Sequence, residues 1–243
     1  ADLNLTGYKL VFDDEFNGTS VDRAKWADTS TSMRDGGRGN LPNKMLEWNS
    51  FDNARVADGV LTIRAEREHV TSPSGTEYDW TSAMLTTSPA FKFKYGYIEE
   101  RAMLPSAKGF WPSFWTWQAS GSNTYQEVDV YEFFSDNHNA LYLSNHLPGG
   151  GTTVIDPSFN PTTGYHTYGA DISSTGVKFY IDGNLVGEKA GGPGDYMNLI
   201  TNMSVFRDVK ADPSTMSAEK KVDYIRVYSK DAGLAEVKPQ AGY

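Results

Sequence analysis

Apolar and polar residues alternate with a period of two along much of the chain, most clearly at residues 54–65 and 91–104. Successive side chains of a β-strand point to opposite faces, so this pattern predicts strands with one buried face. The dipeptides Asp58-Gly59 and Asp182-Gly183 interrupt such runs and are typical of tight hairpin turns. Helical periodicity is essentially missing, with at most one short turn at 213–220. We therefore expect an all-β fold.

One stretch, residues 126–134, places three carboxylates among β-branched and aromatic residues that otherwise predict a strand. On a regular strand, Glu127 and Asp129 would point to one face and Glu132 to the other. A β-bulge, which inserts one extra residue, would bring all three to the same face, and bulges are frequent beside active sites. We expect such a bulge between Asp129 and Glu132.

The three acids are residues of the kind that glycoside hydrolysis requires. Cleavage of a glycosidic bond requires two carboxyl groups with different pKa values, one as nucleophile or base and the other as a protonated acid. Glu127 and Glu132 would flank the bond, while Asp129 lies between them, hydrogen-bonds the nucleophile and through its negative charge keeps the proton on the acid. From spacing alone, an exposed acidic strand or a calcium-binding strand explains the same residues.

The preceding segment, 110–117, is unusually aromatic. Trp111, Trp115 and Trp117 share a parity and therefore a face, next in sequence to the carboxylate strand. Sugar rings stack on aromatic side chains, so these tryptophans are candidate substrate contacts, with a packed sandwich core as the alternative. His146, on the following predicted strand, is a candidate for a hydrogen bond to a sugar hydroxyl or to the acid, or else a core histidine.

The 243 residues carry a formal net charge of -9 and include no cysteine. The acidic balance argues against nucleic acid or an anionic membrane as partner, and no apolar run is long enough for a membrane span. The length suits one large domain, which we place at 1–230, with 231–243 as a tail or the stub of a linker. The polar first residues carry no signal peptide and indicate a mature N-terminus. We expect a monomer.

The motif Glu127-Val128-Asp129-Val130-Tyr131-Glu132 resembles the bulged Glu-x-Asp-x-x-Glu signature of glycoside hydrolase family 16. The likeness runs from about residue 10 to 228 and includes 95–101, 109–115 and 222–228. It implies a jelly-roll β-sandwich of two curved antiparallel sheets with a concave substrate cleft. It also makes the first glutamate of the motif the nucleophile, the aspartate its assistant and the last glutamate the acid/base, with retention at the anomeric carbon.

The resemblance further implies a structural calcium ion on the convex face of the sandwich. Glu15, the carbonyl of Gly59 and Asp223 match the positions that supply its ligands in the family. Oxygen ligands suit calcium, and three unrelated surface groups are the alternative. No cofactor is expected for catalysis.

Where the substrate is concerned, the resemblance is uneven. β-1,3-Glucanases of the family typically carry other residues at 43–48, at Met84 and at Phe206-Arg207. Other segments, 165–169 among them, resemble the branches that act on red-algal galactans, carrageenases most of all. On this basis we expect an endo-acting enzyme for a galactan of the carrageenan or agar type, with endo-β-1,3-glucanase (laminarinase) activity as the alternative.

In a galactanase, Arg207 would bind a sulfate, for which a bidentate guanidinium is well suited. Glu47 and Trp48 are further candidate substrate contacts. A lectin-like module that binds carbohydrate without cutting it is the alternative from another class, although a lectin has no use for paired buried acids. A transglycosylase, which uses the same covalent intermediate, stays open as well. Because a polysaccharide cannot enter a cell, we expect a secreted protein.

Overall fold

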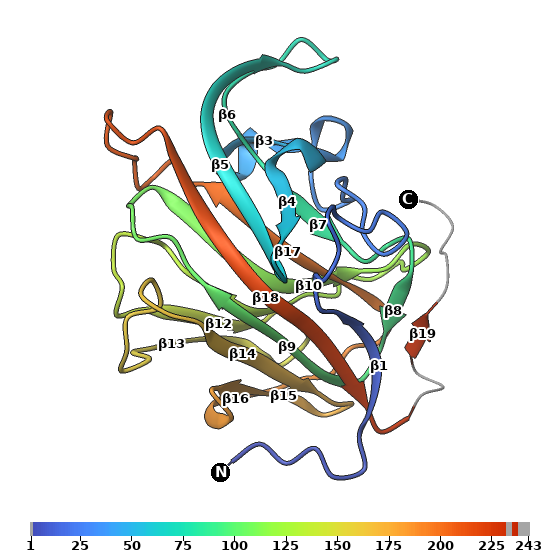
Figure 1. The fold of residues 1–243 in the computed structure, drawn as a ribbon. Coiled ribbons are helices and arrows are strands. Elements are labelled where there is room, and N and C mark those ends of the chain that lie inside the picture. The colour runs from blue at the N-terminus through green and yellow to red at the C-terminus, as the bar shows by residue number, and fades with distance from the viewer. Residues whose placement is uncertain (1, 232–234, 238–243) are drawn as a thin grey trace.

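Two β-sheets that pack face to face make up the computed structural model, which describes residues 2–231 and 235–237 (Figure 1). No helix in these ranges is long and apolar enough to cross a membrane. The elements in chain order are β1 (Lys9–Asp14), η1 (Asp35–Gly37), β2 (Gly39–Asn40), η2 (Leu41–Asn43), β3 (Met45–Asn49), η3 (Phe51–Asn53), β4 (Ala54–Ala57), β5 (Val60–Thr71), β6 (Glu77–Ser82), β7 (Met84–Thr86), β8 (Phe91–Phe93), β9 (Gly96–Met103), β10 (Phe110–Gln118), β11 (Val128–Glu132), β12 (Leu141–Asn145), β13 (Gly151–Ile155), β14 (His166–Ile172), β15 (Gly176–Ile181), β16 (Asn184–Ala190), β17 (Met197–Val205), β18 (Ser217–Ser229) and β19 (Ala235–Val237), the three η elements being short 3-10 helices.

The strand order of each sheet shows where the carboxylate strand lies. The first has the strand order β16-β15-β14-β9-β18-β5-β6-β3-β2, with β1 paired to β18 and β4 to β5. The second has the order β13-β12-β11-β10-β17-β8-β19, with β7 paired to β17, and it contains the carboxylate strand β11. In Figure 1 the long strands β5, β18 and β9 of the first sheet cross in front of β10 and β17 of the second. This arrangement confirms the predicted all-β jelly-roll sandwich.

The hydrophobic core fills the space between the sheets. On β5, Leu61, Ile63 and Ala65 alternate into this core and are fully buried, as the sequence pattern predicts. Burial of a leucine or isoleucine side chain contributes about 1.5–3 kcal/mol. All residues of β17 are buried, and the strand lies in the middle of its sheet, paired with β10 on one side and β7 on the other.

Two predicted hairpin turns are confirmed by their backbone angles. Asp58 and Gly59 have φ values of 54° and 77°, and Asp182 and Gly183 have values of 49° and 79°. Positive φ at both central residues is typical of the type I′ turn, whose twist matches that of the flanking strands. These turns join β4 to β5 and β15 to β16.

The fold departs from the sequence expectations in three places. β3 and β6 pair in parallel, so the first sheet is not wholly antiparallel. Residues 217–220, within the stretch 213–220 predicted as at most a short turn, begin β18 and pair with β5. Within the predicted tail, residues 235–237 form β19 and pair with β8. The rest of that tail, 232–234 and 238–243, lies outside the described residues.

Candidate active site

The predicted β-bulge is present in β11. On the neighbouring β10, Asp129 pairs with Trp115 and Glu132 pairs with Ser113. Three residue steps along β11 therefore match two along β10, and the register with β12 shifts at the same place. Because residues two apart on β10 share a face, Asp129 and Glu132 also point to one face of the sheet.

That face lines a cleft with a volume of about 430 Å³. Carboxyl groups, aromatic rings and small polar groups form its walls. They come from β10, β11, β17, the end of β12 and the N-terminal loops. The lining residues are Ser32, Met33, Asn40, Asn43, Met45, Trp111, Ser113, Trp115, Trp117, Tyr125, Glu127, Asp129, Glu132, His146 and Asn202.

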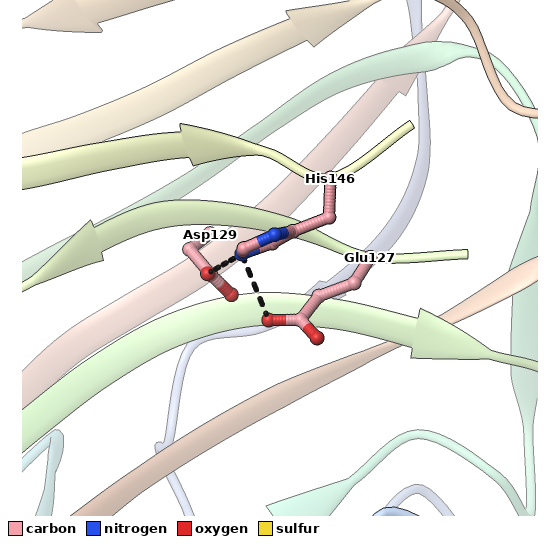
Figure 2. A group of neighbouring side chains, drawn as sticks. All are labelled: Glu127, Asp129 and His146. Carbon is pink, nitrogen blue, oxygen red and sulfur yellow. Dashed lines mark hydrogen bonds and ion pairs between the residues drawn. The ribbon is translucent and has the colours of Figure 1, made fainter. Parts of the chain in front are cut away.

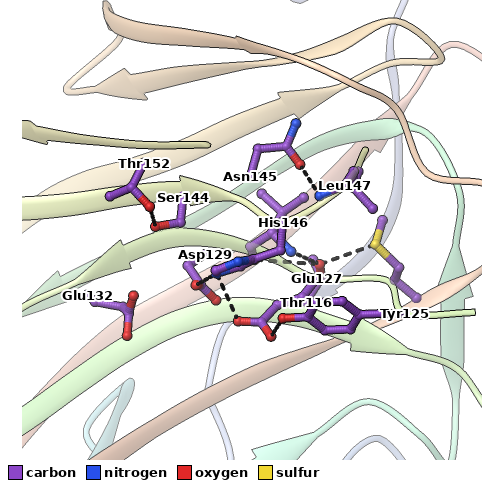
Figure 3. Close-up of polar contacts among 12 residues, drawn as sticks. Thr116, Tyr125, Glu127, Asp129, Glu132, Ser144, Asn145, His146, Leu147 and Thr152 are labelled. Atoms are coloured by element: carbon purple, nitrogen blue, oxygen red, sulfur yellow. Dashed lines mark hydrogen bonds and ion pairs between the residues drawn. The ribbon is translucent and has the colours of Figure 1, made fainter. Parts of the chain in front are cut away.

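Two side chains hold the carboxylate of Glu127, which is 15% exposed (Figure 3). The Tyr125 hydroxyl donates to Glu127 Oε1 at 2.6 Å, and His146 Nε2 lies 3.5 Å from Oε2. The same His146 nitrogen lies 2.8 Å from Oδ2 of Asp129, so the imidazole bridges the two acids (Figure 2). Both oxygens of Glu127 thus have a partner that fixes the orientation of the carboxylate.

The side chain of Asp129 is 5% exposed, and it is the most buried of the three acids. Burial raises the pKa of Asp129 well above its ordinary value, and the charges of Glu127 and Glu132 raise it further. This shift favours the neutral form of Asp129, whose single O–H can donate to either neighbouring glutamate. The direction of this shift opposes the sequence-based argument, in which a negative charge on Asp129 keeps the acid protonated, and the role of Asp129 stays a prediction.

Glu132 has the properties of a proton donor. Burial, followed by the negative charge of Glu127, raises the pKa of Glu132 to about 7. The Trp111 indole N–H, which donates to Glu132 Oε2 at 3.0 Å, acts in the opposite direction, as does the hydrogen bond from Asp129. A carboxyl group with a pKa near neutrality can both give and take a proton under working conditions.

All three tryptophans of β10 line the cleft. Trp111 is partly exposed and packs against Phe134, with 5.3 Å between the ring centroids. Trp117 is also partly exposed. Trp115 is 8% exposed, and its indole N–H donates to Asn202 Oδ1 at 2.9 Å. Trp111 and Trp117 therefore offer ring surface to a sugar, whereas Trp115 mainly builds the wall of the cleft.

Three candidate substrate contacts lie outside the cleft lining, contrary to the sequence expectation. Glu47 is fully buried, and its Oε1 accepts a hydrogen bond from a backbone N–H of β17 at 2.8 Å. Trp48 points to the opposite face of β3 and packs against Tyr78, with 5.3 Å between the ring centroids. Arg207 is exposed and pairs with Asp208 at 2.9 Å. These contacts of the three side chains are thus made with residues outside the cleft lining.

Sequence reasoning missed several lining residues. Tyr125 stands two positions before Glu127, so the shared parity of the two residues was the signal available for it. Asn202 reaches the cleft because β17 pairs with β10, where it lies opposite Ser113. The loops and short elements before β4 contribute Ser32, Met33, Asn40, Asn43 and Met45.

The predicted calcium ligands lie on the first sheet, around β18. Glu15 follows β1 and pairs with Arg226 at 2.6 Å, and Asp223 pairs with Arg101 at 2.8 Å. The oxygen donors suit calcium, but both carboxylates already have a cationic partner. A calcium ion at Glu15, Gly59 and Asp223 stays a prediction.

Comparisons with curated proteins agree with the resemblance seen in the motif. The endo-1,3-1,4-beta-glycanase EglC of Rhizobium meliloti (strain 1021) is 33% identical over 186 residues, which cover 73% of this chain and 40% of that protein. The chain thus spans about two fifths of the length of this relative. Kappa-carrageenase of Pseudoalteromonas carrageenovora is 27% identical over 176 residues, which cover 57% of this chain and 43% of that protein.

The fold is shared with solved structures over most of the chain. The laminarinase catalytic domain from Thermotoga maritima MSB8 superimposes with a TM-score of 0.81 and 28% sequence identity, covering 91% of this chain and 98% of that one. The family model described as glycosyl hydrolases family 16 matches residues 43–225, which include the whole carboxylate motif. The chain belongs to glycosyl hydrolase family 16.

Proposed function

We propose that the chain is a retaining, endo-acting β-glucanase. The observation that carries the proposal is the carboxylate face of the bulged strand, on which Asp129 lies between Glu127 and Glu132 and within hydrogen-bonding reach of both. Inverting enzymes need a gap of roughly 6.5–9.5 Å between their carboxyl groups to admit a water, whereas retaining ones need about 5–5.5 Å. Two glutamates that share one small hydrogen-bonding partner favour the shorter separation and hence double displacement.

In the first step, Glu127 attacks the anomeric carbon while Glu132 gives its proton to the departing glycosidic oxygen. The bond from this carbon to the leaving sugar breaks as the bond to Glu127 forms, which yields a glycosyl-enzyme and a shortened glucan. Because its pKa is raised, Glu132 still carries this proton near neutral pH. Tyr125 and His146 hold the attacking carboxylate before substrate arrives.

In the second step, the ionised Glu132 takes a proton from a water molecule, which attacks the same carbon and releases Glu127. Because each displacement inverts the configuration, the product retains the configuration of the substrate. Asp129, whose pKa is raised, can donate its O–H as a hydrogen bond to the carboxylate that is released. This hydrogen bond stabilises Glu127 as a leaving group without a second buried negative charge beside it.

A neutral glucan suits the cleft better than a sulfated galactan. Of the described residues that line it, none is a lysine or an arginine, while three carry carboxyl groups. Arg207, expected to bind a sulfate, pairs with Asp208 outside the lining. The glycanase and the laminarinase named above also cover more of the chain than the carrageenase does. These observations favour β-1,3- or mixed β-1,3-1,4-glucan over the galactan predicted from the sequence.

The substrate also bears on where the protein acts. A glucan polymer is too large to cross a membrane, so we place the enzyme outside the cell.

The aromatic rings of Trp111 and Trp117 would hold the sugar units next to the cleaved bond.

Release of reducing ends from laminarin, mixed-linkage β-glucan, agar and κ-carrageenan tests this function. We expect release from the glucans, with the β-anomer appearing first in proton NMR. Glu127→Gln should abolish turnover while the unfolding temperature stays unchanged, because the two side chains have nearly the same volume. The matched control is Glu77→Gln, whose carboxylate is 71% exposed on the first sheet and should keep full activity.

Cleavage of carrageenan alone, or normal turnover by Glu127→Gln, would contradict the proposal. Binding of laminarin with no reducing ends released would instead indicate a carbohydrate-binding module.

A further inference from the structure

His146 and the two acids that it contacts are residue types that bind metal ions (Figure 2). We propose that Glu127, Asp129 and His146 bind a divalent transition-metal cation such as Zn²⁺, and that the bound ion blocks the active site. Each residue offers one ligand atom, and the three atoms lie within 4.8 Å of one another. In the contacts of His146, Nε2 of the imidazole faces Oε2 of Glu127 and Oδ2 of Asp129.

The spacing of these atoms suits a small tetrahedral ion. His146 Nε2 lies 2.8 Å from Asp129 Oδ2 and 3.5 Å from Glu127 Oε2. Around a zinc ion with bonds of about 2.0–2.1 Å, tetrahedral angles place neighbouring ligand atoms about 3.3–3.4 Å apart. The two observed separations lie on either side of this range, and the ligand atoms of the two carboxylates lie within 4.8 Å of each other.

The types of ligand define the class of metal. An imidazole with two carboxylates suits zinc, copper and nickel, whereas calcium and magnesium prefer shells of six or more oxygen atoms. Three protein ligands leave a fourth position, which faces the cleft and can take a water molecule. Binding uses the lone pair of His146 Nε2, so the ring proton then sits on Nδ1.

An ion can reach the three ligands from the cleft. The side chain of His146 is 38% exposed, and those of Glu127 and Asp129 are 15% and 5% exposed. The ion would thus pass the imidazole before it meets the buried carboxylate. Once bound, the ion coordinates the carboxylate of Glu127 and fills the space in front of this side chain. Inhibition of glucan hydrolysis by this ion, unlike its binding, rests on the proposed function.

His69 offers a matched control elsewhere on the surface. Its Nδ1 lies 3.0 Å from Asp79 Oδ1, and its Nε2 lies 3.7 Å from Glu77 Oε1. These carboxylates face different ring nitrogens, so a single ion cannot bind all three residues. Across residues 2–231 and 235–237, the active-site trio is the one group of three or more such side chains with ligand atoms this close.

Titration of the metal-free protein with Co²⁺ tests binding without any measurement of activity. A tetrahedral site should give strong visible absorption with one ion per chain, and added Zn²⁺ should remove it. In His146→Ala and His146→Gln the affinity for Co²⁺ should fall by more than roughly tenfold, because a loss of about that size is expected when a residue that only hydrogen-bonds a metal ligand is removed. Circular dichroism checks that each variant is folded. His69→Ala should bind as the wild type does.

Equal Co²⁺ binding by the wild type and a folded His146 variant would overturn the site, as would loss of binding in His69→Ala. In the presence of Zn²⁺, the apparent KM for laminarin should rise while kcat is unchanged, and a chelator should reverse the effect. Calcium at the same concentration should leave the KM unchanged. Zinc binding without inhibition would overturn the blocking role. Failure of the metal-free protein to cleave any glucan would contradict the proposed function but leave the Co²⁺ result intact.

Discussion

Lys220 and Glu100 form an ion pair that is fully buried between the two sheets, with 3.1 Å between Nζ and Oε1. Lys220 also donates to the carbonyl oxygen of Ser113, the residue that pairs with Glu132 across the strands. Tyr131, which precedes Glu132 in the bulged strand, donates its hydroxyl to Glu100 at 2.6 Å. The ion pair therefore supports the catalytic strand from the side of the core.

Removal of the lysine charge from this pair should make the folded protein less stable. Burial lowers the pKa of Lys220, and the charge of Glu100 opposes that shift. Lys220→Met leaves Glu100 buried without its partner, which should lower the free energy of unfolding by about 3–5 kcal/mol in urea titrations. Lys220→Met combined with Glu100→Gln should recover part of this loss, because no buried charge remains. The neighbouring substitution Lys221→Met, on a partly exposed side chain, should change it by less than about 0.5 kcal/mol.

The activity should fall as the pH rises through about 7, because Glu132 must be protonated to act as the acid and its pKa is raised to that value. The Trp111 N–H favours the ionised form of Glu132, so its removal should raise this pKa further. In Trp111→Phe the alkaline limb of kcat/KM against pH should therefore move to higher pH. Trp48→Phe, outside the cleft, should leave the limb in place, and an unmoved limb in both variants would contradict the role of the indole.

Glu132→Gln should lower kcat on laminarin by about 10²–10⁴-fold, because proton donation by a general acid contributes that much. An aryl β-glucoside with an acidic phenol as leaving group needs no proton in the first step. Release of the phenol in a stopped-flow burst should therefore stay close to the wild-type rate, while steady-state turnover is slow. An equal loss on both substrates would show that Glu132 is not the acid.

Glu47 should make stability depend on pH. Burial raises the pKa of this carboxyl group from 4.5 to about 7, so the folded protein keeps the proton over this range while the unfolded chain releases it. The free energy of unfolding should therefore fall by about 3 kcal/mol as the pH rises from the lower value to the upper one. Glu47→Gln should lose this part of the decline and keep its activity, because the residue lies outside the cleft. Parallel stability profiles for the two proteins would rule out this titration.

Tyr125→Phe should lower kcat/KM for laminarin by roughly 10- to 100-fold, since a hydrogen bond to a charged group contributes about 1.5–3 kcal/mol. The variant keeps the ring, which packs edge-to-face against Trp117 with 5.6 Å between centroids, and loses the hydroxyl that holds Glu127. Tyr125→Leu removes both contacts and separates the contribution of the ring. Wild-type kinetics in the phenylalanine variant would show that the hydroxyl has no part in orienting the nucleophile.

The acids and the tryptophans could be placed from the sequence because their arrangement depends on the parity of single strands. Three carboxylates with one extra residue between them require a bulge if they are to share a face, and the register shows that bulge. Tyr125 obeys the same rule and was missed because a tyrosine alone does not indicate catalysis. Parity thus identifies the face of a strand, and the chemistry of the residue types identifies its use.

The other substrate contacts depend on packing between segments that are distant in the sequence. Glu47 accepts a hydrogen bond from a backbone N–H of β17, and Trp48 packs against Tyr78 of β6. The raised pKa of Asp129 likewise follows first from its burial, which depends on the packing of the whole cleft. Such features require the fold before they can be predicted.

Val130 has no partner on β10, since Asp129 pairs with Trp115 and Tyr131 with the residue before it, Phe114. In most strands, deletion of one residue turns every later side chain to the opposite face. Here the ladder already passes over Val130, so its deletion would leave Tyr131 and every later residue of the strand on their present faces. Position 130 is thus a point in the catalytic strand where the chain can change length without reversing the acids.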